Sequence, residues 1–248
     1  MIAARWFAAL LATALLAGCG EGEPHATAPA PDSEQPERLS VYVVNYPLQY
    51  FAERIGGDDV EVFFPAPGDE DPAYWSPDPE VIVAYQGADL ILLNGAGYAA
   101  WVQRASLPAA RLVDTSAGFR DRLIPLEEGV THSHGPQGAH THTGSAFTTW
   151  LDPQLAILQA RAVRNAFAKA RPDREAAFQE RFAALESDLR DLDQQLATVA
   201  AAIGEAPLLF SHPVYQYLVR RYGLNARSVH WEPDQPPTEE MWRELEAL

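Results

Sequence analysis

Two closely spaced histidine pairs are the residues of this chain best suited to chemistry. Four of its seven histidines form two His-x-His pairs, His132 with His134 and His140 with His142. Neutral imidazole is the commonest protein ligand for zinc and its first-row neighbours. Glycine and proline between the pairs predict a flexible loop without regular elements over residues 129–149. This loop is either a metal-binding segment or a solvated polar loop that binds nothing specifically.

The first 19 residues have the pattern of a lipoprotein signal peptide. Arg5 precedes an apolar run too short to span a bilayer, and the run ends in LAGC, which resembles a lipobox. We expect Cys19, the single cysteine, to carry a lipid that anchors the protein outside the cytoplasm, in the periplasm or at the cell surface. Residues 20–38, rich in proline, alanine and acid, are expected to form a disordered tether.

Composition and motif content exclude several function classes. The net charge of −16, from 34 acidic and 18 basic residues, argues against nucleic acid as a partner. A single cysteine permits neither a disulfide framework nor a cysteine-based metal site. The chain has no His-Glu-x-x-His motif, no glycine-rich phosphate loop and no recognisable Ser-His-Asp arrangement, so we do not expect an enzyme.

Residues 39–152 have the alternation of an α/β lobe, which includes the histidine-rich loop. Strands are predicted at 39–45, 60–64, 88–93 and 111–114, and helices at 46–55, 77–87 and 98–104. Repeated strand–helix units imply a parallel sheet, whose ligands bind beyond the carboxyl ends of the strands.

Residues 153–204 are predicted to form a helical connector. One helix covers 153–170, and Asp152 is expected to cap it. In the next helix, apolar residues recur with an unbroken 4-3 spacing from Phe178 to Ile203, before Gly204. A helix of about 30 residues is roughly 45 Å long, enough to join two lobes, although the spacing also fits a coiled-coil dimer.

Residues 205–248 are predicted to form a second βα lobe. Strands are expected at 207–210 and 225–229, and helices at 213–222 and from 237 onward. Because two strands make a thin lobe, we expect this lobe to be either small or incomplete.

The ordered set of motifs resembles the metal-binding receptors of bacterial ABC importers, the zinc and manganese substrate-binding family. The similarity covers residues 39–248, and its main pieces are YPL at 46–48, IGGD at 55–58, DP at 71–72, PDP at 77–79, ADL at 88–90, the histidine-rich loop, WLDP at 150–153, the long helix and His212 with RYGL at 221–224.

The resemblance implies two βα lobes with parallel sheets, joined by one long rigid helix, and a metal ion between the lobes. The transported ligand would be a divalent metal, foremost zinc, with manganese or copper as alternatives, and no organic cofactor. The implied partners are an ABC permease and its ATPase, and the implied state is a monomer.

The implied ligand set is not retained in full. The positions of the first two histidines hold Ala73 and Thr148, whereas the third is retained as His212. The fourth ligand, a carboxylate, lies in the family beyond the position of Leu248. Alanine cannot bind a metal and threonine is a poor zinc ligand.

Three hypotheses follow from this departure. In the first, His212 is joined by loop histidines, foremost His140 and His142, and by a carboxylate from Asp69, Glu70 or Asp71. In the second, the cleft binds a metal chelate or organic ligand between aromatic walls, with Asp71 and Thr148 also in the cleft. In the third, the cleft is degenerate, and the protein scavenges metal through its loop or acts as a surface adhesin. The aromatic candidates are Tyr74, Trp75 and Trp150.

Overall fold

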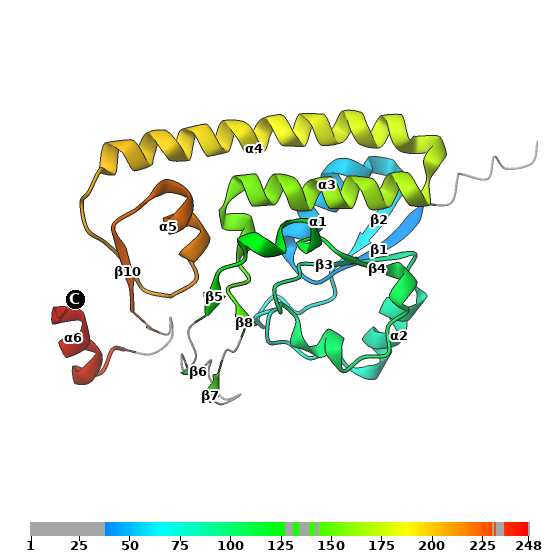
Figure 1. Ribbon diagram of the computed structural model, residues 1–248. Helices are drawn as coiled ribbons and strands as arrows, with labels where there is room; N and C mark the ends of the chain where they lie inside the picture. The colour runs from blue at the N-terminus through cyan, green and yellow to red at the C-terminus, as the bar shows by residue number, and fades with distance from the viewer. Residues whose placement is uncertain are drawn as a thin grey trace, which may run out of the picture. The chain divides into compact units, whose positions relative to one another are not determined.

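The first lobe is built on a four-stranded parallel sheet. A computed structural model describes residues 38–126, 131–133, 139–141, 144–229, 231 and 236–247, all within one compact unit, Pro36–Leu248. The buried strands consist mostly of apolar residues, as expected for a parallel sheet covered on both faces. The strand order is β2-β1-β3-β4, with β1 at Leu39–Val43, β2 at Val60–Phe63, β3 at Leu90–Leu93 and β4 at Leu112–Asp114 (Figure 1).

Side-chain caps fix where the helices of this lobe begin. Asn45 accepts a hydrogen bond from the Leu48 amide ahead of α1 (Tyr46–Gly56). Asp78 accepts a hydrogen bond from the Val81 amide ahead of α2 (Pro79–Gly87). The predicted helix at 98–104 was wrong in extent: only Ala100–Gln103 is helical, as one 3₁₀ segment. Its start is cut short because Ala99 adopts a left-handed conformation, with φ of 56°.

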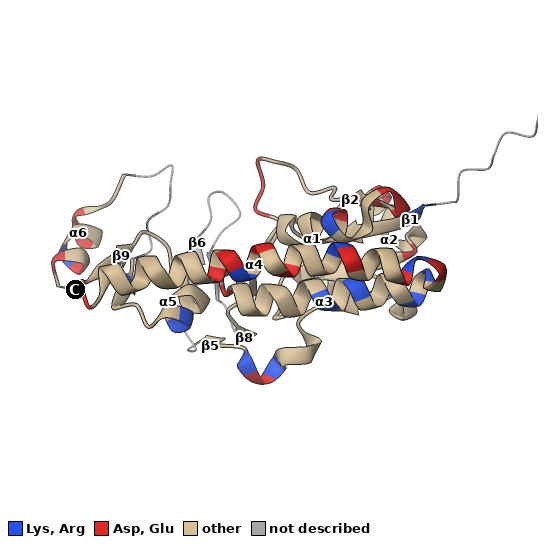
Figure 2. Ribbon diagram, turned by 90° about the horizontal axis from the view of Figure 1, so that it is seen from above, with Lys and Arg blue, Asp and Glu red and all other residues tan. Residues whose placement is uncertain are grey.

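The connector is a pair of long helices that run side by side (Figures 1 and 2). Helix α3 (Pro153–Ala170) begins at Asp152, whose carboxylate accepts a hydrogen bond from the Gln154 amide, so the predicted cap is confirmed. Helix α4 (Glu175–Ile203) follows a short 3₁₀ segment. Its 29 residues confirm the predicted long helix.

The apolar stripe of α4 is buried only along its first half. Phe178, Phe182 and Leu185 are at most 2% exposed and belong to the core shared with α1 and α3. Leu192 and Val199 are 44% and 55% exposed. No charged residue occurs between positions 194 and 203, whereas the preceding part carries many (Figure 2). Packing on the first lobe therefore explains the first half of the stripe.

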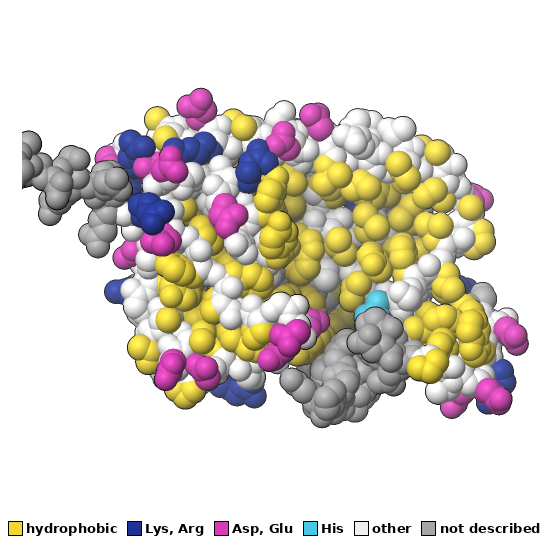
Figure 3. All heavy atoms as spheres, turned by 180° about the vertical axis from the view of Figure 1, so that it is seen from behind, with side chains coloured by type: hydrophobic (Ala, Val, Ile, Leu, Met, Phe, Trp, Pro, Cys, Tyr) yellow, Lys and Arg dark blue, Asp and Glu magenta, His cyan; other side chains and the backbone are white. Residues whose placement is uncertain are grey.

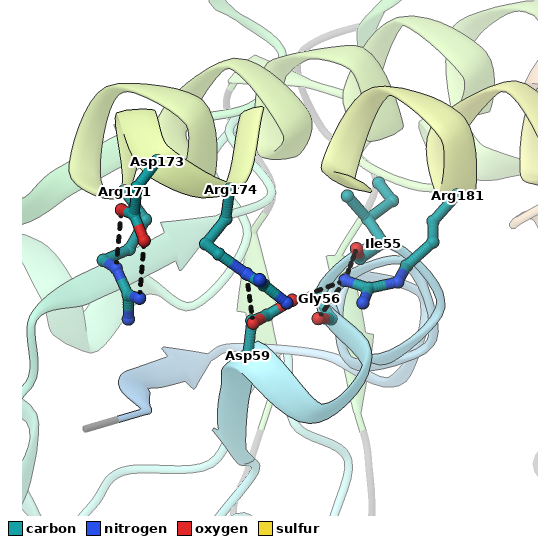
Figure 4. Close-up of polar contacts among 7 residues, drawn as sticks. All are labelled: Ile55, Gly56, Asp59, Arg171, Asp173, Arg174 and Arg181. Atoms are coloured by element: carbon teal, nitrogen blue, oxygen red, sulfur yellow. Dashed lines mark hydrogen bonds and ion pairs between the residues drawn. The ribbon is translucent and has the colours of Figure 1, made fainter. Parts of the chain in front are cut away.

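An ion-pair cluster attaches the beginning of α4 to the sheet side of the first lobe (Figure 4). Arg174 Nε and Arg181 Nη1 lie 2.7 and 2.9 Å from the two carboxylate oxygens of Asp59. Arg181 also donates to the carbonyl oxygen of Gly56 at 2.6 Å, at the end of α1. The cluster joins the beginning of α4 to the end of α1 and to the segment ahead of β2.

The second lobe contains a two-stranded parallel sheet. Strand β9 (Leu208–Phe210) pairs with β10 (Ala226–Ser228), and α5 (Gln216–Tyr222) connects them. Helix α6 (Glu239–Glu246) is capped by Thr238. Leu209 and Trp242 are about half exposed, and one face of the molecule carries a broad area of hydrophobic side chains (Figure 3). The prediction of two βα lobes with parallel sheets joined by one long helix is confirmed.

The histidine-rich loop contains short strands, so the expectation of no regular element was wrong. Strand β5 (Pro125–Leu126) pairs with β8 (Gly144–Ser145), and β6 (Thr131–Ser133) pairs with β7 (Ala139–Thr141). Three-residue strands tolerate a glycine- and proline-rich connection because only their own residues need an extended backbone. No helix among the described residues is both long and apolar enough to cross a bilayer.

Candidate functional site

Buried polar residues follow the strands at one edge of the first-lobe sheet. Asn45 follows β1, Asn94 follows β3 and Thr115 follows β4, and each is at most 2% exposed. Asn45 Nδ2 donates to Asn94 Oδ1 at 3.1 Å. Since the carboxyl ends of parallel strands form the usual ligand-binding edge, this network lies beneath the expected site.

Gln159 of α3 joins this network to the chain ahead of α3. Its amide nitrogen lies 3.1 Å from both Asn94 Oδ1 and Thr115 Oγ1, and its amide oxygen accepts from Thr149 Oγ1 at 3.1 Å. The side chain is fully buried. Sequence reasoning missed this residue. Its signal was a polar side chain within the apolar stripe that also contains Leu155.

A strained turn follows β3. Gly95 has φ of 75°, and a Cβ there would lie 1.8 Å from Ser116 Oγ, so only glycine fits. Ala96 and Ala99 also have positive φ, which is uncommon outside glycine and is often found at functional sites. The turn carries Tyr98.

Tyr98 is the centre of an aromatic cluster at this edge. Its ring centroid lies 5.1 Å from that of Phe147 and 5.9 Å from that of Trp150. The ring centroid of Tyr74 lies 6.3 Å from that of Phe147. Burial raises the pKa of the Tyr98 phenol, with added contributions from Asp71 and Tyr74. The structure thus brings together Asp71, Tyr74 and Trp150 of the predicted cleft.

Trp75 is not part of this cluster. It packs edge-on against Trp101, with ring centroids 6.4 Å apart, and Trp101 belongs to the buried core. Asp71 lies on an exposed turn, where its side chain accepts a hydrogen bond from the Ala73 amide at 2.9 Å. Ala73 is 4% exposed, so the first implied ligand position is filled by a buried methyl group.

Thr148 forms a hydrogen bond between the two lobes. Its side chain is nearly buried, at 7% exposure, and Oγ1 donates to the carbonyl oxygen of Val214 at 2.6 Å. Val214 is two residues after His212, so the second implied ligand position adjoins the third. The hydroxyl hydrogen of Thr148 is therefore used in a hydrogen bond to a backbone oxygen.

The ring of His212 is oriented by a backbone carbonyl. Its Nδ1 lies 3.0 Å from the oxygen of Trp231. Because a carbonyl oxygen only accepts, Nδ1 carries the hydrogen, and the lone pair of the neutral ring is then on Nε2. A metal-binding histidine typically has this arrangement, with the other ring nitrogen donating to a carbonyl or carboxylate.

The predicted loop ligands are only partly described. His132 and His140 are register partners in the β6–β7 pair, so their backbones lie side by side. His134 and His142 lie outside the described residues, as do Cys19 and residues 1–37. Asp69 and Glu70 are exposed. Within the described side chains, no group of three or more His, Cys, Asp or Glu residues is arranged to hold a metal.

The fold and the sheet-edge site define a two-lobed substrate-binding protein, with a parallel sheet in each lobe and one long helix between them. The chain belongs to the ZnuA family, described as zinc-uptake complex component A, periplasmic, whose model matches residues 41–248. Members of this family are components of a transport system, and membership implies an extracytoplasmic location.

Known relatives support this assignment. The chain is 27% identical over 232 residues to the high-affinity zinc uptake system protein ZnuA of Bacillus subtilis, covering 90% of this chain and 70% of that protein. The crystal structure of the metal-dependent lipoprotein YcdH from Bacillus subtilis superposes with a TM-score of 0.70 at 25% identity, covering 85% of this chain and 74% of the other. A ZnuA deletion mutant with zinc bound gives a TM-score of 0.67 at 26% identity, covering 85% and 77%.

Proposed function

We propose that this protein captures zinc outside the cytoplasm and delivers it to an ABC importer. The observation that carries the proposal is the orientation of His212, whose Nδ1–H donates to the carbonyl oxygen of Trp231, as is typical of a metal-binding histidine. The zinc-uptake relatives favour zinc over manganese or copper as the cargo. The function involves transport without catalysis and needs no organic cofactor.

The remaining ligands are proposed to come from outside the two altered positions. Ala73 has no donor atom, and the Thr148 hydroxyl donates to Val214. The segment just ahead of Thr148 supplies four imidazoles, those of His132, His134, His140 and His142. Asp71, which acts electrostatically on Tyr98, could supply a carboxylate. The pairing of β6 with β7 supports a shared site because it brings the backbones of one histidine from each pair together.

Zinc titration of four proteins tests the relocated site: the wild type, His212→Ala, a deletion of residues 132–142, and Asp71→Asn. In a shared coordination shell, His212→Ala and the deletion each weaken zinc binding strongly, because each removes ligands from the same ion. The wild type should also bind more weakly below about pH 6, where imidazole ligands protonate. If the deletion only lowers the number of weakly bound ions and His212→Ala changes nothing, the loop scavenges zinc and the shared site is wrong.

A second candidate ligand is a metal chelate or an organic molecule. The observation that favours it is the aromatic cluster of Tyr74, Tyr98, Phe147 and Trp150, which lies where the altered histidine positions are. A wild type that binds no free zinc, manganese or copper would favour this candidate over the first.

The proposed cellular setting is a monomeric lipoprotein held at a membrane through Cys19. Residues 20–38 would act as a tether, and the permease and ATPase of an ABC importer would be the partners. The family supports an extracytoplasmic location, and the LAGC sequence supports the lipid anchor.

A further inference from the structure

Helix α5 of the second lobe packs into an apolar cluster formed by the first lobe and helix α3. Tyr217 is fully buried and packs with Phe119, Ala146 and Leu155. Its phenol donates to the carbonyl oxygen of Ala146 at 2.8 Å and accepts from the Ile124 amide at 3.2 Å. One side chain therefore satisfies two backbone groups of the opposite lobe.

Thr148 makes a second buried contact close to the first. Its hydroxyl donates to Val214 O at 2.6 Å, in the segment that links β9 to α5. Thr148 and Ala146 belong to the same short stretch of the first lobe. The two contacts thus join residues 146–148 to residues 214–217, with one hydrogen bond donated from each lobe to the other. We call these two contacts, of Thr148 and Tyr217, the α5 dock.

Polar contacts at the end of α5 surround the dock. Arg220 donates to the carbonyl oxygen of Arg122 at 2.7 Å. Arg221 pairs with Asp193 of α4 at 2.6 Å and lies 3.7 Å from Asp152 at the start of α3. The Arg220 and Arg221 side chains are more exposed than Thr148 and Tyr217, so water screens their interactions more strongly.

We propose that Thr148 and Tyr217 are positioning residues that hold the His212 segment at a fixed place on the first lobe, with or without a bound metal. Thr148 then acts as a bond between the lobes and not as a metal ligand. This proposal rests on the proposed function in one respect, that His212 binds zinc. The docking itself depends only on the contacts described above.

The docking is tested by distance measurements on metal-free protein. Spin labels at Glu80→Cys in α2 and Arg227→Cys in β10, both exposed positions, report the separation of the lobes in a full chain carrying Cys19→Ala. Thr148→Val and Tyr217→Phe should each broaden the distance distribution, and Thr148→Ser should restore the wild-type distribution because it keeps the hydroxyl.

Two matched controls accompany these variants. Thr198→Val removes a hydroxyl that donates to Gln194 O within α4, and Tyr46→Phe removes the phenol oxygen of a tyrosine that is 66% exposed. Both should leave the distances unchanged. If Thr148→Val and Tyr217→Phe also leave them unchanged, the two residues do not position the lobes and the proposal is overturned.

Zinc affinity tests the consequence for His212. Thr148→Val should weaken zinc binding roughly five- to tenfold, about the effect of one lost hydrogen bond, and Thr148→Ser should retain it. Equal loss in the valine and serine variants would overturn the positioning role of the hydroxyl. If the wild type binds no zinc, the proposed function fails, while the distance measurements still decide the docking.

Discussion

Gln159 shows why a polar residue can be kept in an apolar helix stripe. Burial of an amide without partners costs several kcal/mol, but here the amide bonds to Asn94, Thr115 and Thr149. The same bonds fix the chain ahead of α3, which includes Phe147 and Thr148. The residue thus links the packing of α3 to the geometry of the sheet-edge site.

Replacement of Gln159 should lower stability markedly. In Gln159→Leu, the hydroxyl of Thr149 loses its acceptor, and the hydrogen bonds to Asn94 and Thr115 disappear. We expect the free energy of unfolding to fall by roughly 2–4 kcal/mol, measured by urea denaturation. Gln195→Leu makes the same change at an exposed position of α4 and should alter stability by less than about 0.5 kcal/mol. Equal effects of the two substitutions would contradict the assigned role of the network.

Helix α4 is the element whose two halves behave differently. The first half is anchored by core packing and by the Asp59 cluster, whereas the second half carries half-exposed apolar side chains such as Val199. A stripe with regular 4-3 spacing predicts that a helix is amphipathic, but not how much of the stripe is covered. The coiled-coil alternative is not needed for the first half, because α1 and α3 cover it.

Asp59 makes the anchoring of α4 dependent on pH. Burial raises the pKa of its carboxyl, but the hydrogen bonds from Arg174 and Arg181 outweigh this, and the pKa lies below its ordinary value. A depressed pKa stabilises the fold above the unfolded-state value, near 4, and this contribution disappears as pH falls through the folded-state value. Asp59→Asn should therefore cost roughly 1–3 kcal/mol at pH 7, and less as the pH falls below about 4.

Urea denaturation at several pH values checks this dependence. Asp58→Asn is the matched control, since Asp58 is adjacent in the chain and exposed. It should change stability little at any pH. A constant difference between Asp59→Asn and the wild type from pH 7 to pH 3 would show that the carboxylate charge does not anchor the helix.

At the scale of the whole molecule, the two lobes are connected by more than the long helix. The α5 dock joins them directly, and Asp193 in the middle of α4 accepts hydrogen bonds from both Arg221 and Tyr222. Helix stiffness alone predicts limited hinge motion. The side-chain contacts supply a second and more local reason for it.

The N-terminal segment carries the proposed lipid anchor at Cys19. We expect Cys19→Ala to move the protein from the membrane fraction to the soluble fraction, because a lipid anchor contributes about 0.8 kcal/mol for each buried methylene group. Fractionation followed by immunoblotting measures the distribution. Ser33→Ala, in the acidic segment that follows, serves as the control and should stay with the membrane. Continued membrane association of the Cys19→Ala variant would refute the lipid anchor.

Several elements were predictable because their signals are local. The apolar run that became β3, the proline and Asp152 that open α3, and the spacing along α4 each depend on neighbouring residues only. The helix predicted at 98–104 was wrong in extent because two alanines in the turn after Gly95, Ala96 and Ala99, adopt left-handed backbone angles. The short strands in the histidine-rich loop were missed because they depend on pairing with another segment, which the composition of the loop does not reveal.

The sequence by itself determined the family, the alternation of strands and helices, the long connector and the loss of two implied histidine ligands. Only the tertiary structure decided what the altered positions do. Ala73 fills a buried space, and Thr148 bonds to Val214 across the lobes. It also decided the tautomer of His212, through the carbonyl of Trp231. The physical reason is that a side chain's residue type fixes which bonds it can form, whereas the partner is chosen by residues distant in sequence that folding brings within about 3 Å.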